Sequence, residues 1–362
     1  MRYGFILICV CALYLHINGQ ARFTLNDFCA ENNDLDNLVD SAFEKLTDKE
    51  KAAQLIMYAV SSTDNVYTFT KTKKLLQDTI ISNVVFLKGH LDVIKNQINQ
   101  FDSMQRNLQN LYACDCEPSL FNMKYFGSSK VPKTNLLIYD SLLRQYTDTI
   151  IATLRRTGIQ INFAPVVDKA FNTAVINNRS FGKNDSAIIH LSNQFISQTQ
   201  EQQIATSIKH FPGHGNVTGD SHKNLVYIDG ALKEIQNFDS VYQASKPIFT
   251  MVGHIAVKNN QDWNTFNEPS TISANIVNGL LKNKLQFKGI AVTDAMNMLG
   301  VATIPDADFK ALKAGIDMVL MPVNPRKLHQ QILDEMKKDS FLSKQINASI
   351  KKIIRLKLCL TE

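Results

Sequence analysis

Polar residues of catalytic type are concentrated between Lys209 and His222. The stretch from Lys209 to Gly215 is Lys-His-Phe-Pro-Gly-His-Gly, and Asp220 and His222 follow it closely. Histidine and aspartate can transfer protons near neutral pH, and lysine can donate hydrogen bonds to a ligand oxygen. The proline and glycines favour a loop whose backbone can approach a ligand closely. This segment is the first candidate for a functional site.

A metal site is one alternative interpretation of this loop. His210 and His214 have the four-residue spacing of a zinc pair on a helix. Pro212 stands between them and opposes a helix, and no acidic residue lies between them. We therefore expect neither a metal nor any other cofactor.

Three further interpretations remain open. The glycines at Gly213, Gly215 and Gly219 approximate a dinucleotide-binding fingerprint, but with one residue too many, and the loop continues past Asp220 instead of opening a helix, so this interpretation is weaker than a metal site. Ser221 beside His222 suggests a serine nucleophile, but no nucleophile-elbow pattern surrounds it. The loop could also be purely structural, with its polar groups satisfied internally.

A second concentration of chemistry is a buried strand that ends on an acid. Residues 289–293 are apolar or β-branched, and Asp294 follows them directly. An isolated carboxylate is costly in apolar surroundings, so it is either paired or directed at a ligand. Asp294 is thus the candidate nucleophile. Other polar residues at expected strand ends are Asp140 and His254, while Arg179 lies in a long segment and could equally form a surface ion pair.

The elements that must position these residues alternate between strands and helices. Eight short apolar runs predict strands at 53–59, 83–88, 135–139, 159–163, 203–208, 248–252, 289–293 and 316–321. Helices are expected at 141–157, 231–245 and 270–285, with a closing helix at 337–360. The pattern favours an α/β fold, a single (β/α)8 TIM-type barrel, over an open doubly wound sheet. A barrel places functional residues at the carboxyl ends of its strands.

The length agrees with one such barrel. The chain has 362 residues, of which 44% are hydrophobic and 20% charged, as in ordinary globular proteins. We find no linker rich in proline, glycine or serine, so residues 20–362 are predicted to form one domain. The net charge of +6 comes from scattered lysines, which excludes a nucleic-acid stripe.

Residues 1–19 have the pattern of a secretory signal peptide. Arg2 precedes an apolar run from Phe5 to Leu15, and small residues follow at Gly19 and Ala21. That run is too short to span a bilayer, so we expect an exported protein without an integral membrane segment. In an oxidising compartment the remaining cysteines, Cys29, Cys114, Cys116 and Cys359, could pair in three ways.

The motifs together resemble glycoside hydrolase family 3, in particular its bacterial β-N-acetylglucosaminidase branch. The string from Lys209 to Gly215 is the most specific element of this resemblance. The other motifs occur in the family's order: Asn162 to Val166, Arg179 to Gly182, Asp220 to His222, Val292 to Asp294 and Ala314 to Leu320. The resemblance covers most of the chain from about residue 45 onward.

The resemblance implies a retaining exo-glycosidase in which Asp294 attacks the anomeric carbon and water then hydrolyses the glycosyl-enzyme. In that branch a histidine on the loop after the fifth strand is the acid/base, and an aspartate supports it. These residues would be His222 and Asp220. An adjacent carboxylate favours the imidazolium, which can protonate a leaving oxygen near neutral pH.

Residues that hold the sugar also follow from the resemblance. Lys209, His210 and Arg179 would bind the non-reducing-end sugar, together with Asp140 and His254. The family usually has Asp-x-Glu-Gly-Gly-Arg after the third strand, whereas Asp140 to Gln145 keeps only the aspartate of that pattern. The shape of the sugar pocket is therefore expected to differ.

We thus expect an exported, monomeric β-N-acetylglucosaminidase that acts on short oligosaccharides or cell-wall fragments such as muropeptides. Sequons at Asn178 and Asn216 lie in the site loops, so either the source is bacterial or they carry no glycan. A bacterial source makes the periplasm or the exterior the expected location. The alternatives are a barrel that only binds sugar and a phosphorylase, because a histidine acid/base does not repel phosphate.

Overall fold

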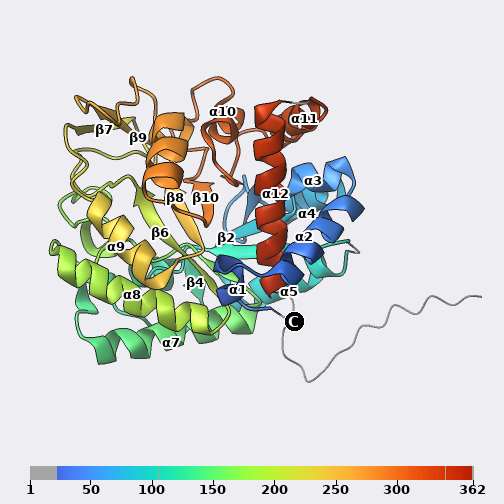
Figure 1. The fold of residues 1–362 in the computed structure, drawn as a ribbon. Coiled ribbons are helices and arrows are strands. Elements are labelled where there is room, and N and C mark those ends of the chain that lie inside the picture. Colours follow the sequence, from blue (N-terminus) through green and yellow to red (C-terminus); the bar gives the residue numbers. More distant parts are fainter. Residues whose placement is uncertain (1–22, 105, 339, 361–362) are drawn as a thin grey trace, which may run out of the picture.

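The computed structural model describes residues 23–104, 106–338 and 340–360, so the predicted signal peptide lies outside the described residues. A parallel β-sheet curves into a barrel at the centre of the molecule (Figure 1). The spatial order of the barrel strands in the described part is β10, β8, β6, β5, β3, β2, β1 and β11. A parallel bridge between Val292 and Met318 joins the two ends of this order. The predicted α/β barrel is confirmed.

The barrel strands are short and parallel to one another. Their bounds are β1 Ile56–Ser61, β2 Asn83–His90, β3 Leu111–Cys114, β5 Ile161–Asn162, β6 Ala205–Phe211, β8 Phe249–Val252, β10 Ile290–Thr293 and β11 Val319–Leu320. The short strand β4, Tyr125–Phe126, pairs with β2. The strands β7, Val226–Asp229, and β9, Ile255–Lys258, form a separate two-stranded sheet.

Helices surround this barrel (Figure 1). Those on the N-terminal half are α1 Leu25–Cys29, α2 Asn33–Lys45, α3 Asp48–Gln54, α4 Phe69–Gln77, α5 Leu91–Asp102, α6 Pro118–Lys124 and α7 Asp140–Thr157. The others are α8 Asp185–Glu201, α9 Ile235–Ser245, α10 Ala307–Ala314, α11 Pro325–Met336 and α12 Phe341–Leu360. A π-helix, η4, spans Asn275–Lys284, and short 3-10 turns lie at η1 Thr134–Leu136, η2 Asn177–Arg179 and η3 Ser270–Ile272.

Local chemistry sets several of the helix boundaries. The Asn184 side chain accepts the backbone N–H of Ala187 and so starts α8. Gly158 ends α7 with φ +87°, a left-handed conformation that favours glycine. The expected closing helix is present as α12, where Arg355 donates hydrogen bonds to the carbonyl groups of Asp27, Phe28 and Ala30. This contact fixes α1 against α12.

The predicted third strand is wrong. Residues 134–136 form a 3-10 turn, and Leu136, Ile138 and Tyr139 are exposed instead of packing into a sheet. The third barrel strand is β3, whose four residues are fully buried. This strand is hard to recognise in the sequence because its apolar run is short and polar residues flank it at Asn110 and Asp115. This shift changes which acid stands at the end of the third strand.

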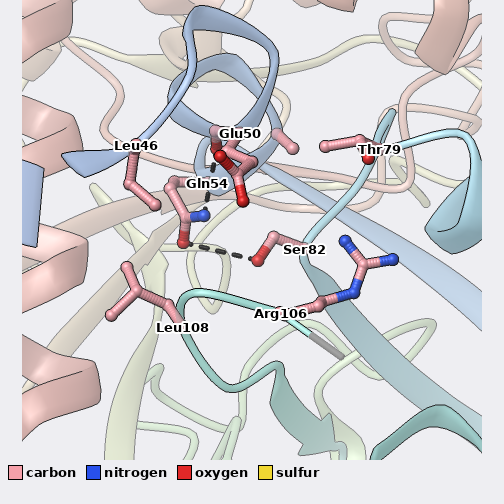
Figure 2. Close-up of a pocket in the computed structure, with 8 residues that line it drawn as sticks. Leu46, Glu50, Gln54, Thr79, Ser82, Arg106 and Leu108 are labelled. Atoms are coloured by element: carbon pink, nitrogen blue, oxygen red, sulfur yellow. Dashed lines mark hydrogen bonds between the residues drawn. The ribbon is translucent and has the colours of Figure 1, made fainter. Parts of the chain in front are cut away.

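A pocket lies at the amino ends of the barrel strands (Figure 2). Its lining includes Gln54, Ser82 and Leu108, which precede β1, β2 and β3 along the chain. Ser82 donates a hydrogen bond to the Gln54 side chain at 3.4 Å. Because parallel strands share one direction, this pocket lies at the opposite end of the barrel from the predicted catalytic residues. In the part of the chain that the structure describes, no helix combines the length and apolarity needed to cross a membrane.

Candidate active site

The predicted residues gather at the carboxyl ends of the barrel strands, with Asp140 as the exception. Lys209 and His210 lie near the carboxyl end of β6, and Asp294 directly follows β10. His254 follows β8, and Arg179 ends the 3-10 turn after β5. His210, His254 and His222 all help to lower the pKa of the Asp294 carboxyl, so the four residues belong to one electrostatic environment.

Asp294 is held in an ionised state by its surroundings. Burial raises the pKa of Asp294, but His210, His254 and the Ala295 N–H outweigh burial, so the net pKa lies below its ordinary value. One carboxylate oxygen accepts the Ala295 N–H at 2.8 Å, and the Asp294 N–H donates to the Val252 carbonyl at 2.9 Å. A fixed, ionised carboxylate at a strand end can act as a nucleophile.

His254 holds the backbone directly after Asp294. Its side chain is fully buried, with Nε2 bonded to the Ala295 carbonyl at 3.1 Å and Nδ1 bonded to Thr271 Oγ1 at 2.7 Å. Both ring nitrogens are therefore engaged by protein groups. This geometry suits a residue that positions the backbone beside Asp294, whereas the sequence analysis expected a sugar contact.

Asp220 and His222 form a hydrogen-bonded pair. His222 Nδ1 lies 2.8 Å from Asp220 Oδ1, and the His222 N–H donates to the same oxygen at 2.9 Å. Burial raises the pKa of Asp220, but these contacts with His222 outweigh burial, so the net pKa lies below its ordinary value. An ionised Asp220 only accepts hydrogen bonds, so Nδ1 of His222 must carry the hydrogen. The His222 side chain is 58% exposed, which leaves Nε2 accessible for proton transfer.

The loop of this pair rests on the segment that follows the nucleophile. The Leu299 N–H donates to the His222 carbonyl at 3.3 Å, and the Gly300 N–H donates to the Ser221 carbonyl at 3.2 Å. Ser221 is buried while His222 is exposed, so their side chains point apart. Because His222 Nδ1 is bonded to Asp220 and its Nε2 faces solvent, this arrangement favours Asp294 as nucleophile over Ser221.

Two acids that no sequence motif indicated, Asp115 and Glu117, neutralise the cations of the site. Lys209 Nζ lies 2.8 Å from Asp115 and 3.0 Å from Glu117. Arg179 binds both oxygens of Glu117, at 2.8 and 2.9 Å, and Lys124 binds Asp115 at 3.0 Å. Lys209 and Glu117 are each 1% exposed, so these charges are desolvated and depend on one another.

The pKa values of the two acids follow from this pairing. Burial raises the pKa of Glu117, but Arg179 and Lys209 outweigh burial and lower it to about 2. The pKa of Asp115 lies well below its ordinary range, because Lys124 and Lys209 overcome the effect of burial. Arg179 is thus a largely buried partner of the fully buried Glu117 and does not form a surface ion pair.

His210 is fixed by another acid outside the predicted set, Asp168. One Asp168 oxygen accepts from His210 Nδ1 at 2.7 Å and from the His210 N–H at 3.0 Å. The other oxygen accepts the His214 N–H at 2.8 Å. His210 Nε2 lies 3.5 Å from Arg179. With Nδ1 bonded to a carboxylate, His210 presents Nε2 toward the site, where it can meet a sugar hydroxyl.

Asp140 does not belong to this site. It is the first residue of α7, its side chain is 61% exposed, and it pairs with His190 at 2.8 Å. The third strand ends at Cys114 and is followed by Asp115-Cys116-Glu117, which has the Asp-x-Glu of the family pattern. The expected departure at this position was therefore a misplacement by 25 residues, and only the glycines and arginine of the pattern are replaced. A disulfide joins Cys114 and Cys116 on either side of Asp115, and within the described residues Cys29 and Cys359 form no disulfide.

The fold and site define a (β/α)8 barrel with a carboxylate and a histidine–aspartate pair at the carboxyl ends of its strands. Residues 47–356 match the model of the glycosyl hydrolase family 3 N terminal domain. The chain belongs to this family. The resemblance predicted from the motifs is confirmed.

Named relatives add detail to this assignment. The chain is 31% identical over 230 residues to beta-hexosaminidase A of Pseudoalteromonas piscicida. This alignment covers 56% of this chain and 38% of the relative. It is 30% identical over 205 residues to a beta-hexosaminidase of Actinobacillus pleuropneumoniae, covering 54% of this chain and 58% of the relative. The alignments thus span less than two thirds of these relatives.

Solved structures share the fold. The beta-N-acetylhexosaminidase of Beutenbergia cavernae superposes with a TM-score of 0.75 at 23% identity, covering 86% of this chain and 99% of that one. A beta-glucoside phosphorylase superposes with a TM-score of 0.81 at 18% identity, covering 91% of this chain and 62% of that one. At these identities the similarity establishes the barrel architecture.

Proposed function

We propose that this protein is a retaining exo-β-N-acetylglucosaminidase that uses Asp294 as nucleophile and His222 as acid/base. The observation that carries the proposal is the Asp220–His222 pair, whose loop is hydrogen-bonded to the segment directly after Asp294. The beta-hexosaminidase relatives support the choice of sugar. A histidine acid/base also avoids the repulsion that a second carboxylate would exert on Asp294.

In the first step a carboxylate oxygen of Asp294 attacks the anomeric carbon. The bond from that carbon to the leaving oxygen breaks, and His222 Nε2 donates its proton to that oxygen. The products are a glycosyl ester on Asp294 and the free alcohol. Asp220 stabilises the imidazolium before the transfer and keeps the ring in the orientation that presents Nε2.

In the second step the neutral His222 removes a proton from water as the water oxygen attacks the anomeric carbon. The ester bond to Asp294 breaks, and the carboxylate is restored. Two displacements at one carbon retain its configuration. The imidazolium that results is the acid needed for the next turnover, so the cycle is balanced.

Lys209, His210 and Arg179 are proposed to hold the terminal sugar, together with Asp115 in the place first given to Asp140. Asp115 is 28% exposed while Lys209 is 1% exposed, so Asp115 is the more accessible member of this ion pair. Charged donors and acceptors fixed by one another present a rigid surface to sugar hydroxyls. A short substrate, such as an oligosaccharide or a muropeptide, fits such a site.

The working location proposed for the enzyme is the periplasm or the exterior of a bacterium, because residues 1–19 have the signal-peptide pattern. Cell-wall fragments are a substrate class available there.

The test is hydrolysis of a nitrophenyl β-N-acetylglucosaminide and of N-acetylglucosamine disaccharides, with and without phosphate. We expect free N-acetylglucosamine of retained configuration in both conditions. Acceleration by phosphate with a sugar phosphate as product would replace hydrolysis by phosphorolysis. Binding of the sugar without turnover on any β-hexosaminide would contradict an enzymatic role.

A further inference from the structure

Glu234 is a buried acid that none of the motifs includes. It directly precedes α9 and is 2% exposed. Its carboxylate accepts the backbone N–H of Lys169 at 2.6 Å, of Gly215 at 3.3 Å and of Asn216 at 2.9 Å. One side chain from the outer helix layer thus joins the loop after β5 to the loop after β6.

The glycines of the Lys209 to Gly215 string make room for this side chain. A Cβ on Gly213 would lie 2.8 Å from the Glu234 Cβ. A Cβ on Gly215 would lie 2.6 Å from a Glu234 oxygen and 2.0 Å from the Lys169 carbonyl. Distances below 3 Å are forbidden contacts for carbon, so any larger residue would expel the carboxylate or shift the loop. The glycines and Glu234 therefore form one packing unit.

The Glu234 packing unit links the loop that holds His210 to the loop that leads to His222. Lys169 follows Asp168, which holds His210 and the His214 N–H. Asn216 begins the segment that leads to His222, and the Asn172 side chain ties the carbonyl of Gly219 back to the loop after β5 at 3.0 Å. The orientation of both imidazoles thus depends on how these two loops are held together.

We infer that Glu234 is a positioning residue for the reaction, holding the loop after β6 so that the Asp220–His222 pair faces the leaving oxygen. The inference rests on the proposed function. Burial and the Asp168 carboxylate raise the pKa of Glu234 to about 7, while the three backbone N–H groups favour its ionised form. Glu234→Gln has the same shape as the protonated acid, and its amide group cannot accept all three N–H groups.

The experiment compares wild type and Glu234→Gln on aryl β-N-acetylglucosaminides with leaving groups of different acidity. A dinitrophenolate leaves without protonation, whereas a phenolate or a sugar hydroxyl needs the proton of His222. We expect kcat/KM to fall about tenfold more for the phenyl and disaccharide substrates than for the dinitrophenyl substrate, as expected for impaired acid catalysis. A merely structural role would lower both by the same factor.

Asp317→Asn is the matched control. Asp317 is also a buried carboxylate that accepts a backbone N–H, from Ala291 at 2.9 Å, but it precedes β11 at the amino end of the barrel. This substitution should leave the ratio between the two substrate classes unchanged. Glu234→Asp keeps the negative charge on a side chain that is one methylene shorter. The ratio of its kcat/KM on the dinitrophenyl substrate to that on the phenyl substrate should therefore lie between the ratios of wild type and Glu234→Gln.

The outcomes separate this inference from the proposed function. Equal losses on all leaving groups in Glu234→Gln and Glu234→Asp would overturn the role of Glu234. If Glu234→Gln does not fold, Glu234→Asp decides by the same ratio. A wild-type protein that cleaves no β-N-acetylglucosaminide would overturn the proposed function itself.

Discussion

The residues of this site show how buried charges determine one another. Lys209 and Arg179 can remain charged inside the barrel only because Glu117 and Asp115 stand within hydrogen-bond distance. Removal of one member leaves an uncompensated charge, which is more damaging than removal of the whole set. The positions of these four side chains are therefore interdependent.

Glu117→Gln should destabilise the protein at neutral pH by about 3–5 kcal/mol, the usual effect of breaking a buried ion pair. The folded pKa of Glu117 is about 2 and the ordinary value is 4.5, so its stabilising contribution is complete above 4.5 and is lost as the pH falls toward 2. The difference between wild type and variant in urea unfolding should shrink over that range. A difference that is constant with pH would contradict the pairing.

Asp294→Ala should lower kcat on a nitrophenyl substrate by about 10³-fold or more, because no glycosyl ester can form. The thermal unfolding midpoint serves as the control for folding. Turnover at the wild-type rate would refute the assignment of Asp294 as nucleophile.

At the scale of elements, the apolar runs predicted every barrel strand of the described part except β3. Residues 203–208 and 289–293 overlap β6 and β10, so Lys209 and Asp294 were found at their carboxyl ends. β3 has four residues, and an exposed apolar stretch at 135–139 resembled a strand better. The polar partners Asp168 and Glu234 carry no motif, because only the packing of two loops and a helix brings them to the site.

The corrected third strand leads to a paired prediction. Asp115→Asn should raise KM for a short N-acetylglucosaminide by about 10- to 100-fold, since it removes a charged contact to Lys209. Asp140→Asn should stay within about twofold of wild type, because its exposed pair with His190 lies on α7. Steady-state kinetics of both variants, which gives KM for each, is the measurement that checks this prediction. A larger rise in KM for Asp140→Asn than for Asp115→Asn would contradict the assignment of Asp115 to the sugar site.

At the scale of the whole molecule, the two ends of the barrel differ in character. The carboxyl ends hold the acids and imidazoles, while the amino ends carry a pocket lined by Gln54, Ser82 and Arg106 (Figure 2). α12 packs alongside the barrel and is fixed to α1 through Arg355 (Figure 1). Substitutions at the amino end should therefore affect stability more than chemistry.

Export is a prediction at this scale. When the full chain is produced in a bacterium with two membranes, the periplasmic fraction should contain protein that begins near residue 20. N-terminal sequencing and fractionation measure this directly, and a chain lacking residues 1–19 is the control that should stay in the cytoplasm. Cytoplasmic protein with residues 1–19 intact would contradict the signal peptide.

The central claim is that His222 is the proton donor, and the leaving-group dependence of His222→Ala tests it most directly. Loss of general acid catalysis lowers rates by about 10²–10⁴-fold where protonation is needed. We predict such a loss of kcat/KM on a phenyl or disaccharide substrate and a far smaller loss on the dinitrophenyl glycoside. An equal loss on all three substrates would contradict the account.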